Sequence, residues 1–270
     1  MKKNVLISGS TRGLGLACAK YLATSYDVIL TDISKEAYSV YNESESLEQI
    51  INHLRDHGSK TKFYSADLTI ESKAQGLVKQ ILKDYGRIDC LINCAGGDIF
   101  GDDNQAAGGK HPVNDAMIDY DDFFNIFDKN FTTCFNLSKS VAQIMKTNKR
   151  GKIVNIASIS AGFGGLNETA YSTGKSAIIH YTRCLASQLR DYDINVNCVV
   201  PGGINTGRFM QTLKNRNDYD LSLLDSKSKL SRLAEPIDVA SVINFFLSED
   251  SNFVSGQVLR VDGGQFTNPI

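Results

Sequence analysis

A serine, a tyrosine and a lysine stand at spacings that could support proton transfer. Ser158 follows the apolar run 153–156, and Tyr171 and Lys175 lie further along, four residues apart. On a helix, a four-residue step puts two side chains on one face, one turn apart. A phenol has a pKa of ~10 and is a poor base at neutral pH, but a nearby ammonium favours the phenolate. The pattern therefore predicts a tyrosine general acid or base with a lysine beside it.

Segments that could position these side chains alternate between two apolar patterns. Short runs rich in β-branched residues predict buried strands, and the stretches between them, such as 47–54 and 74–82, have helical spacing. A late helix is expected to begin just after Pro236, a favourable first-turn residue. We expect strands at 5–7, 28–30, 63–64, 88–92, 153–156, 196–200 and 258–261. This alternation predicts an α/β fold, a doubly wound three-layer sandwich with a seven-stranded parallel sheet.

Ligands bind such sheets beyond the carboxyl ends of the strands, and there the first strand runs into a glycine-rich turn. Gly9, Gly13 and Gly15 permit a tight turn and a close approach of the backbone to a ligand. The following helix, expected at 16–23, offers free N–H groups and a partial positive charge to a pyrophosphate. The turn therefore predicts a dinucleotide site, although its G-x-x-x-G-x-G spacing differs from the common G-x-G-x-x-G.

Several motifs in one order make the chain resemble the short-chain dehydrogenase/reductase family, from about residue 4 to residue 264. Besides the glycine-rich turn, they are Asn93-Cys94-Ala95-Gly96, Ser158 with Tyr171-Ser172-Thr173-Gly174-Lys175, and Pro201-Gly202-Gly203-Ile204-Asn205-Thr206. Cys94 stands where the family has a second asparagine. The resemblance implies a Rossmann-type fold, and it is broadly similar to the 3-oxoacyl-carrier-protein reductase-like members.

The resemblance implies a role for four catalytic residues. Tyr171 donates a proton to a carbonyl oxygen as hydride arrives, or removes it in the oxidation direction. Lys175 supports the phenolate and also holds the nicotinamide ribose. Ser158 donates a hydrogen bond to the substrate oxygen and steadies its developing charge. Asn130 matches the family's helix asparagine, which keeps a water in the proton relay.

The resemblance also implies which residues hold a nicotinamide cofactor. Asp32, at the end of the second strand, would accept hydrogen bonds from the adenosine ribose and repel a 2′-phosphate, which favours NAD. Arg12 favours NADP instead, because family members that use NADP often carry a basic residue in this turn. We expect NAD, with NADP as the second choice. The implied contacts are Gly9, Thr11, Arg12, Gly13, Leu14, Gly15, Asp32, Ile33, Asp67, Leu68, Asn93, Ala95, Gly96, Tyr171, Lys175, Pro201, Ile204 and Thr206.

Two segments could contact the substrate, in addition to Ser158 and Tyr171. The segment 97–114 is rich in Gly and Asp and includes Lys110 and His111, and a connection this long is commonly a lid or binding loop. The segment 207–233 matches the family's substrate loop and carries Arg208. We hypothesise that Arg208, with Lys110 or His111, contacts an anionic or strongly polar substrate. Solvated surface charge is the alternative, and the more common use of such residues.

Composition and charge exclude several classes of protein. The 270 residues include 29 Lys and Arg against 30 Asp and Glu, and a net charge of −1 argues against a nucleic-acid partner. The longest stretch without these charges, 153–167, has 15 residues, whereas a membrane span needs ~20 apolar ones. No signal peptide is expected at the N-terminus. With no repeat or linker, we expect one domain over 1–270.

The six cysteines predict neither disulfides nor a metal site. No pair has CxxC spacing, and no histidine lies at ligand spacing from any of them. We therefore expect reduced, buried thiols and a cytoplasmic protein.

These observations lead to one main hypothesis on function and two alternatives. The main one is an NAD-dependent oxidoreductase that interconverts a secondary alcohol and a ketone on a small-molecule substrate. The alternatives are an NADPH-dependent 3-oxoacyl-carrier-protein reductase and, more distantly, a non-catalytic nucleotide-sensing protein. Helices containing 123–145 and 171–189 resemble the pair through which family members associate, so we expect a homotetramer, with a homodimer second. The sequence leaves the substrate and the direction of reaction open.

Overall fold

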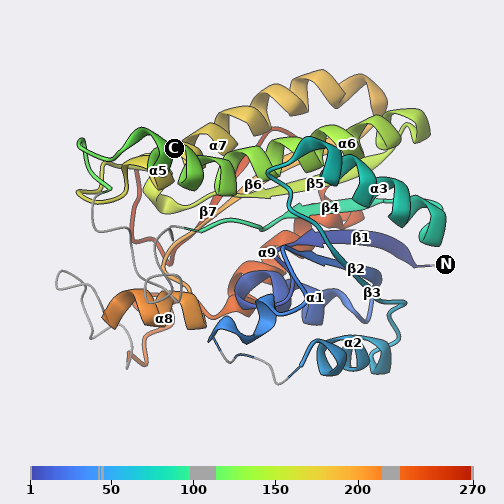
Figure 1. Ribbon diagram of the computed structural model, residues 1–270, viewed down its shortest axis with the longest axis horizontal. Coiled ribbons are helices and arrows are strands. Elements are labelled where there is room, and N and C mark those ends of the chain that lie inside the picture. The colour runs from blue at the N-terminus through green and yellow to red at the C-terminus, as the bar shows by residue number, and fades with distance from the viewer. Residues whose placement is uncertain (1, 42, 44–45, 98–113, 215–225, 269–270) are drawn as a thin grey trace.

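The computed structural model describes residues 2–41, 43, 46–97, 114–214 and 226–268 (Figure 1). Its strands are β1 (Lys3–Ser8), β2 (Tyr26–Asp32), β3 (Lys62–Ser65), β4 (Cys90–Asn93), β5 (Gly151–Ile156), β6 (Ile194–Pro201) and β7 (Val258–Val261). They form one parallel sheet in the order β3-β2-β1-β4-β5-β6-β7. The predicted seven-stranded parallel sheet is confirmed. Its order reverses between β1 and β4, where the fold class is expected to bind ligands.

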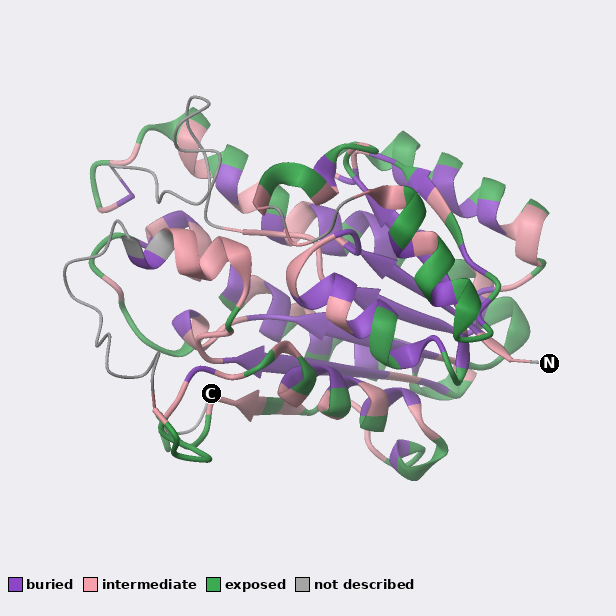
Figure 2. Cartoon of the chain, turned by 90° about the horizontal axis from the view of Figure 1, so that it is seen from below, coloured by how far each residue is buried: buried purple, intermediate pink, exposed green. Residues whose placement is uncertain are grey.

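Helices cover both faces of the sheet. The main ones are α1 (Gly13–Leu22), α2 (Leu47–Asp56), α3 (Glu71–Tyr85), α5 (Tyr120–Phe127), α6 (Thr133–Asn148), α7 (Thr169–Leu189), α8 (Gly207–Lys214) and α9 (Pro236–Leu247). In Figure 1, α1, α2 and α9 lie below the sheet, and α3, α6 and α7 lie above it. Each layer buries its apolar side chains against one face of the strands. Figure 2 accordingly shows mostly buried strands and exposed outer helix surfaces. The three-layer sandwich is therefore confirmed.

The stretch 123–145, expected as a single helix, contains a change of helix type. Between α5 and α6 lies a π-helical turn, η2 (Asp128–Thr132). Such turns insert one residue into a helix and occur often at functional sites. Asn130 lies in this turn and is completely buried. The turn therefore sets the direction of a side chain for which the sequence predicts a catalytic role.

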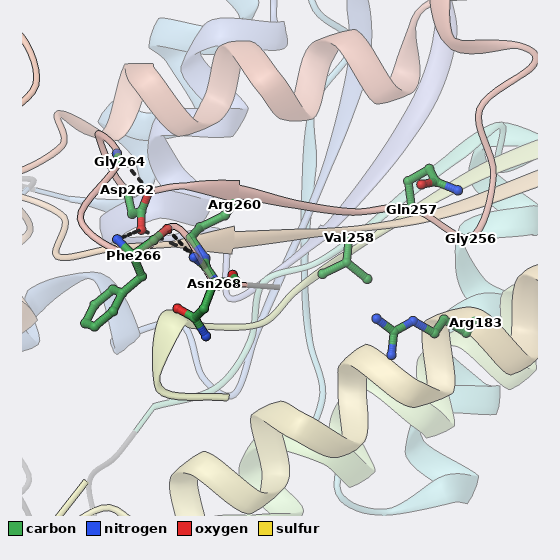
Figure 3. Close-up of a pocket in the computed structure, with 9 residues that line it drawn as sticks. All are labelled: Arg183, Gly256, Gln257, Val258, Arg260, Asp262, Gly264, Phe266 and Asn268. Atoms are coloured by element: carbon green, nitrogen blue, oxygen red, sulfur yellow. Dashed lines mark hydrogen bonds and ion pairs between the residues drawn. The ribbon is translucent and has the colours of Figure 1, made fainter. Parts of the chain in front are cut away.

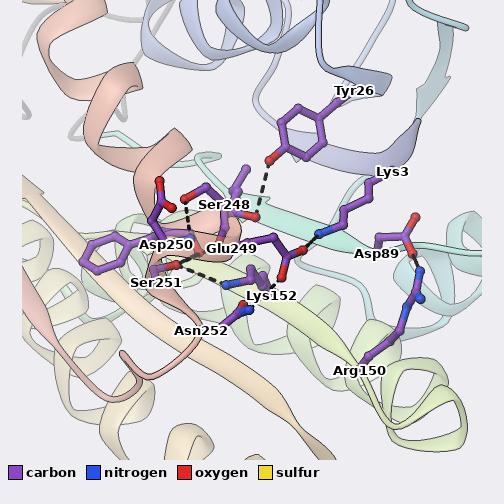
Figure 4. A network of polar contacts seen from close by, with 12 residues as sticks. Lys3, Tyr26, Asp89, Arg150, Lys152, Ser248, Glu249, Asp250, Ser251 and Asn252 are labelled. Carbon is purple, nitrogen blue, oxygen red and sulfur yellow. Dashed lines mark hydrogen bonds and ion pairs between the residues drawn. The ribbon is translucent and has the colours of Figure 1, made fainter. Parts of the chain in front are cut away.

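Polar contacts fasten the amino ends of the strands to the segment after α9, a short helix η6 (Glu249–Ser251) (Figure 4). Lys3 at the start of β1 pairs with Glu249. Lys152 of β5 donates a hydrogen bond to the Ser251 hydroxyl at 3.1 Å. The Tyr26 hydroxyl donates to the carbonyl of Leu247 at 3.3 Å. These contacts hold the end of the sheet opposite the predicted site, so the carboxyl ends remain available to build a pocket.

The cysteines are all free, and their burial differs from the expectation at two positions. Cys18, Cys90, Cys134 and Cys198 are buried, but Cys94 is only partly buried and Cys184 is exposed. Cys184 belongs to the outer surface of α7, so the expectation of burial was wrong for this thiol. Across the described ranges, no helix combines the length and apolarity that a membrane span requires.

Candidate active site

A pocket of about 1380 Å³ opens at the carboxyl ends of the strands, beside the reversal of strand order. Residues from the first turn, the ends of β2, β4, β5 and β6, and the helices α7 and α8 line it together. Those for which the sequence predicts a role are Gly9, Arg12, Gly13, Leu14, Gly15, Asp32, Ile33, Asp67, Leu68, Ala95, Gly96, Ser158, Tyr171, Lys175, Pro201, Ile204, Thr206 and Arg208. The structure thus brings most of the predicted cofactor and catalytic residues into one cavity, whereas Thr11, Asn93 and Asn130 do not line it.

The glycine-rich turn packs directly against its neighbours. A Cβ atom on Gly15 would lie 2.0 Å from the carbonyl oxygen of Gly9, so α1 starts in contact with the turn itself. Gly9 has a φ of +62°, and a Cβ there would lie 2.9 Å from the Cα of Ala95. Side chains at these positions would collide with the chain itself, so glycine keeps the turn packed against α1 and the end of β4. Gly9, Gly13 and Gly15 also line the pocket, so their backbone is bare of side chains there.

Three donors fix the Asp32 carboxylate at the pocket wall. Its Oδ2 accepts hydrogen bonds from the hydroxyl and the backbone N–H of Thr11, at 2.6 and 3.2 Å. Its Oδ1 accepts the N–H of Ile33 at 2.9 Å. Thr11 is completely buried, so its side chain acts on the pocket through Asp32. These three donors fix the orientation of the carboxylate, which lines the cavity.

Lys175 and Tyr171 lie beside each other on α7, as their spacing predicts. The Lys175 ammonium lies 5.7 Å from the centroid of the Tyr171 ring and donates a hydrogen bond to the carbonyl of Ile156 at 3.0 Å. Lys175 is buried, and burial lowers the pKa of its ammonium, with a further lowering from Arg208. A buried cation beside a phenol favours the phenolate.

Ser158 follows β5 and faces the same cavity. It caps a short helix, η3 (Ile159–Gly162), and its hydroxyl oxygen accepts the N–H of Ser160 at 3.2 Å. Because the oxygen accepts this bond, the hydroxyl proton can be donated into the pocket. The geometry can therefore offer one O–H from Ser158 and one from Tyr171 to a substrate oxygen.

Asn130 contacts the backbone after β4 and lies next to α7. Its Oδ1 accepts the N–H of Gly97 at 3.0 Å, and its Nδ2 donates to the carbonyl of Gly97 at 2.9 Å. A Cβ on Gly174 would lie 3.3 Å from the Asn130 Cβ, so this glycine lets the π-helical turn pack close to α7. A Cβ on Gly96 would lie 2.6 Å from Asn130 Oδ1 and 3.2 Å from Lys175 Nζ. Asn130 therefore lies within the same cluster as the lysine.

Asn93, which the sequence predicts as a cofactor contact, does not line the pocket. Its side chain is buried and donates hydrogen bonds to Ser138 Oγ and Asn155 Oδ1, both at 2.8 Å. Asn155 in turn donates to Thr182 Oγ1 at 2.9 Å. Asn93 thus joins β4 to β5 and α6 behind the pocket wall, because alternate residues of a strand point to opposite faces.

Tyr41, after β2, is a pocket residue that the sequence analysis missed. The guanidinium of Arg12 lies 5.1 Å from the centroid of its ring, and that of Arg208 lies 6.0 Å from it. Arg208 also donates to the Tyr41 hydroxyl at 3.4 Å and to the carbonyl of Gly96 at 2.5 Å. Arg208 thus reaches from α8 across the pocket to the end of β4. The other two residues of the substrate hypothesis, Lys110 and His111, lie outside the described residues, as do 98–113 of the expected lid and 215–225 of the expected substrate loop.

Aromatic side chains border the cavity near Ser158. Phe163 and Phe266 stack with their ring centroids 4.9 Å apart, and both line the pocket together with Phe209. Arg260 of β7 holds the segment of Phe266 by donating hydrogen bonds to the carbonyls of Phe266 and Asn268 (Figure 3). A second hollow of about 730 Å³ lies on the other side of this segment, between β7 and Arg183 of α7. The sequence carried no signal for this aromatic border, because Phe163 and Phe266, which stack on each other, are 103 positions apart in the chain.

Comparisons with known proteins agree with this geometry. The model of the short chain dehydrogenase family matches residues 3–217. A (2S)-[(R)-hydroxy(phenyl)methyl]succinyl-CoA dehydrogenase subunit of Thauera aromatica is 33% identical over 96% of this chain and 95% of its own length. A cyclohexanol dehydrogenase of a Rhodococcus species is 32% identical, over 97% and 95%. A 3-oxoacyl-[acyl-carrier-protein] reductase of Buchnera aphidicola is 31% identical, over 98% of each chain.

Two solved structures are similar along nearly the whole chain. A 7α-hydroxysteroid dehydrogenase complexed with NADH and 7-oxo glycochenodeoxycholic acid has a TM-score of 0.82 and 27% identity, over 97% of this chain and 93% of that one. The protein ElxO with NADP bound has a TM-score of 0.79 and 30% identity, over 98% of each chain. The chain therefore belongs to the short-chain dehydrogenase family, whose members are oxidoreductases that act on alcohol or ketone groups with a nicotinamide cofactor.

Proposed function

We propose that this protein is an NAD-dependent oxidoreductase that interconverts a secondary alcohol and a ketone. The observation that carries the proposal is one cavity lined by Asp32 and by Ser158, Tyr171 and Lys175. The residues fit a dinucleotide, because Gly9, Gly13 and Gly15 line the cavity without side chains and Gly13 begins α1. When bound, the nicotinamide supplies or accepts the hydride.

In this proposal, the side chains of the chain handle the proton and the substrate oxygen. Tyr171 donates its phenolic proton to the carbonyl oxygen during reduction and removes the alcohol proton during oxidation. Ser158 donates a second hydrogen bond to the same oxygen. Lys175, held by the carbonyl of Ile156, favours the phenolate and contacts the nicotinamide ribose. Asn130 holds a water that relays the proton.

The cofactor contacts that we propose are mainly residues that line the pocket. They are Gly9, Arg12, Gly13, Leu14, Gly15, Asp32, Ile33, Asp67, Leu68, Ala95, Gly96, Tyr171, Lys175, Pro201, Ile204 and Thr206, with Thr11 acting through Asp32 and Asn93 through the backbone that follows it. NAD is favoured because the Asp32 carboxylate, held by three donors, would repel a 2′-phosphate.

One observation favours a second candidate, an NADPH-dependent 3-oxoacyl-carrier-protein reductase. Arg12 lies in the same turn, and its buried Nη1 has no hydrogen-bond partner among the described residues. That nitrogen could bind a 2′-phosphate. Asp32 opposes this, and we therefore keep NADP as the second choice.

The substrate that we propose combines an apolar part with a polar or anionic one. Phe163, Phe209 and Phe266 offer an apolar surface next to Ser158. Arg208 supplies positive charge, although its bonds to Tyr41 and Gly96 also support a purely structural role. The relatives' names include cyclohexanol, which is mainly apolar, and an aryl-substituted succinyl-CoA, which combines an apolar ring with anionic groups.

We further propose that the chain acts as one domain in a homotetramer or homodimer in the cytoplasm. Exposed aromatic side chains on α5 and α6, Tyr120, Phe124 and Phe135, offer an apolar surface for association. Six free cysteines fit a reducing compartment.

The experiment that tests the proposal is a titration of the protein with NADH and, separately, with NADPH, followed by nicotinamide fluorescence. Tight binding of NADH and weak binding of NADPH supports the NAD-dependent enzyme. Preference for NADPH would overturn the choice of cofactor and move the reductase alternative ahead. Binding of neither would contradict the whole assignment.

A further inference from the structure

Two backbone N–H groups from different helices converge on one carboxylate of the chain. Glu43 Oε2 accepts the N–H of Gly13 at 2.6 Å, and Glu43 Oε1 accepts the N–H of Gly207 at 2.6 Å. Gly13 is the first residue of α1, and Gly207 is the first residue of α8. A single side chain thus links the starts of two helices that are far apart in the sequence.

The Glu43 carboxylate lies at the starts of two helices, where a phosphate group could also bind. Free N–H groups and the positive end of the macrodipole make a helix start an anion site. Gly13 belongs to the glycine-rich turn, and Glu43, Gly13 and Thr206 all line the large pocket. A Cβ on Gly13 would lie 3.7 Å from Thr206 Cγ2, and a Cβ on Gly207 would lie 3.1 Å from Glu43 Oε1. The three segments therefore meet at one point of the cavity.

The charges around this point also favour an anion. The guanidinium groups of Arg12 and Arg208 both lie near the ring of Tyr41. Burial lowers the pKa of Arg12 and Arg208 lowers it further, whereas the Glu43 carboxylate acts in the opposite direction. Two carboxylates of the described chain, Asp32 and Glu43, act on Arg12, and of these two Glu43 is the one that accepts the N–H groups of Gly13 and Gly207. A dinucleotide that binds the turn would bring its own two phosphate charges to the same N–H groups.

We propose that Glu43 is a built-in competitor of the cofactor's pyrophosphate, and that the dinucleotide binds only when this carboxylate leaves Gly13 and Gly207. The inference rests on the proposed dinucleotide cofactor. Two anions cannot share one pair of donors, because each N–H makes one strong hydrogen bond and like charges repel at contact. Glu43 therefore weakens binding of any ligand that carries the pyrophosphate, and leaves a ligand without phosphate unaffected.

The test compares Glu43→Gln and Glu43→Ala with the wild-type chain by calorimetric titration of NADH, ADP and adenosine. Glu36→Gln is the matched control, because Glu36 is an exposed acid of the same β2–α2 connection. Glu43→Ala should bind NADH and ADP about 10-fold more tightly, the gain expected when a charge-assisted hydrogen bond no longer competes. Glu43→Gln, whose amide oxygen can still accept one N–H, should bind them more tightly than the wild type but less tightly than Glu43→Ala. Adenosine affinity should stay unchanged in every variant, and Glu36→Gln should match the wild type.

A repeat of the titrations in 0.5 M salt separates contact from long-range charge. Salt screens distant charges strongly, so a gain that persists supports competition at Gly13 and Gly207, and a gain that vanishes overturns it. Unchanged affinity for ADP would also overturn the proposal, and weaker binding of NADH would show that Glu43 instead helps to hold the cofactor. If neither the wild type nor the Glu43 variants bind NADH, NADPH or ADP, the proposed function itself fails.

Discussion

The ammonium of Lys175 lies 5.7 Å from the ring centroid of Tyr171, and the carbonyl of Ile156 anchors it at 3.0 Å. The lysine lines the pocket and is nevertheless buried, so a positive charge is held where little water can screen it. This arrangement links the strand β5, which supplies the carbonyl, with the helix α7, which supplies both side chains. Because burial removes water from the ammonium, the charged form of Lys175 also lowers the free energy of unfolding.

Replacement of Lys175 by Met should therefore change how stability depends on pH. Burial lowers the lysine pKa in the folded state below its unfolded value, so the unfolded chain binds more protons between the two values. The free energy of unfolding of the wild type should therefore rise as the pH rises through that window. Lys175→Met has no ammonium at this position, so its free energy of unfolding should lack this rise. The stability of Lys175→Met relative to the wild type, from urea midpoints, should fall as the pH rises through this window toward the usual lysine pKa of ~10.4. Lys139→Met, at an exposed position, is the control, and a constant difference would contradict the account.

Replacement of Asp32 by Ala should weaken NADH binding by about 10-fold or more, because the ribose loses a charged acceptor. Binding of NADPH should improve relative to NADH, since the repelling charge is gone. The measurement is the ratio of the two dissociation constants. Asp32→Asn, which keeps an acceptor but not the charge, should recover part of the NADH affinity. An unchanged ratio in both variants would exclude Asp32 as the selector.

Replacement of Gly15 by Ala should lower the free energy of unfolding by about 2–4 kcal/mol, since the new Cβ would meet a backbone oxygen that cannot yield easily. Dinucleotide binding should be lost with it. Gly76→Ala is the matched control, because nothing lies within 4 Å of an added Cβ in the middle of α3. There, alanine should stabilise the protein by about 0.5–1 kcal/mol. Equal effects at both positions, measured by urea unfolding, would rule out the close packing of the turn.

Alkylation at pH 8 should modify Cys184 much faster than the other thiols. Cys184 is exposed on α7, whereas burial raises the pKa of Cys94 to about 11, although Cys94 borders the pocket. Mass spectrometry after brief exposure to iodoacetamide should find one labelled site, and Cys184→Ser should remove it. Rapid labelling of Cys94 would show that the pocket exposes this thiol more than the structure indicates.

Local sequence signals predicted most of the elements that support the site. The helix α9 begins at Pro236, as expected of a proline in the first turn, and α3 ends before Gly86, whose φ is +76°. Short apolar runs marked all seven strands: most are rich in β-branched residues, and β3 is marked by Phe63 and Tyr64. The order of the motifs then placed Ser158, Tyr171 and Lys175 beyond the correct strands.

Local sequence patterns could not predict contacts between residues that are far apart in the chain. Glu43 contacts Gly13 and Gly207, which are 30 and 164 residues away, so no local pattern marks it. Asn93 and Cys94 are neighbours in one motif, yet only Cys94 borders the pocket, because the register of β4 decides which residue faces inward. The π-helical turn at Asn130 likewise depends on packing against Gly174 rather than on helical propensity.

The most direct test of the account is the turnover of Tyr171→Phe. The assay uses the secondary alcohol that reacts fastest with NAD in a screen that begins with cyclohexanol, and Tyr181→Phe, on the same helix, is the control. Tyr171→Phe should lose about 10²–10⁴-fold in kcat, because the phenol is the group to which we assign the proton transfer, while its affinity for NADH stays at the wild-type value. Turnover at the wild-type rate in Tyr171→Phe would contradict the assignment of this tyrosine as the general acid and base.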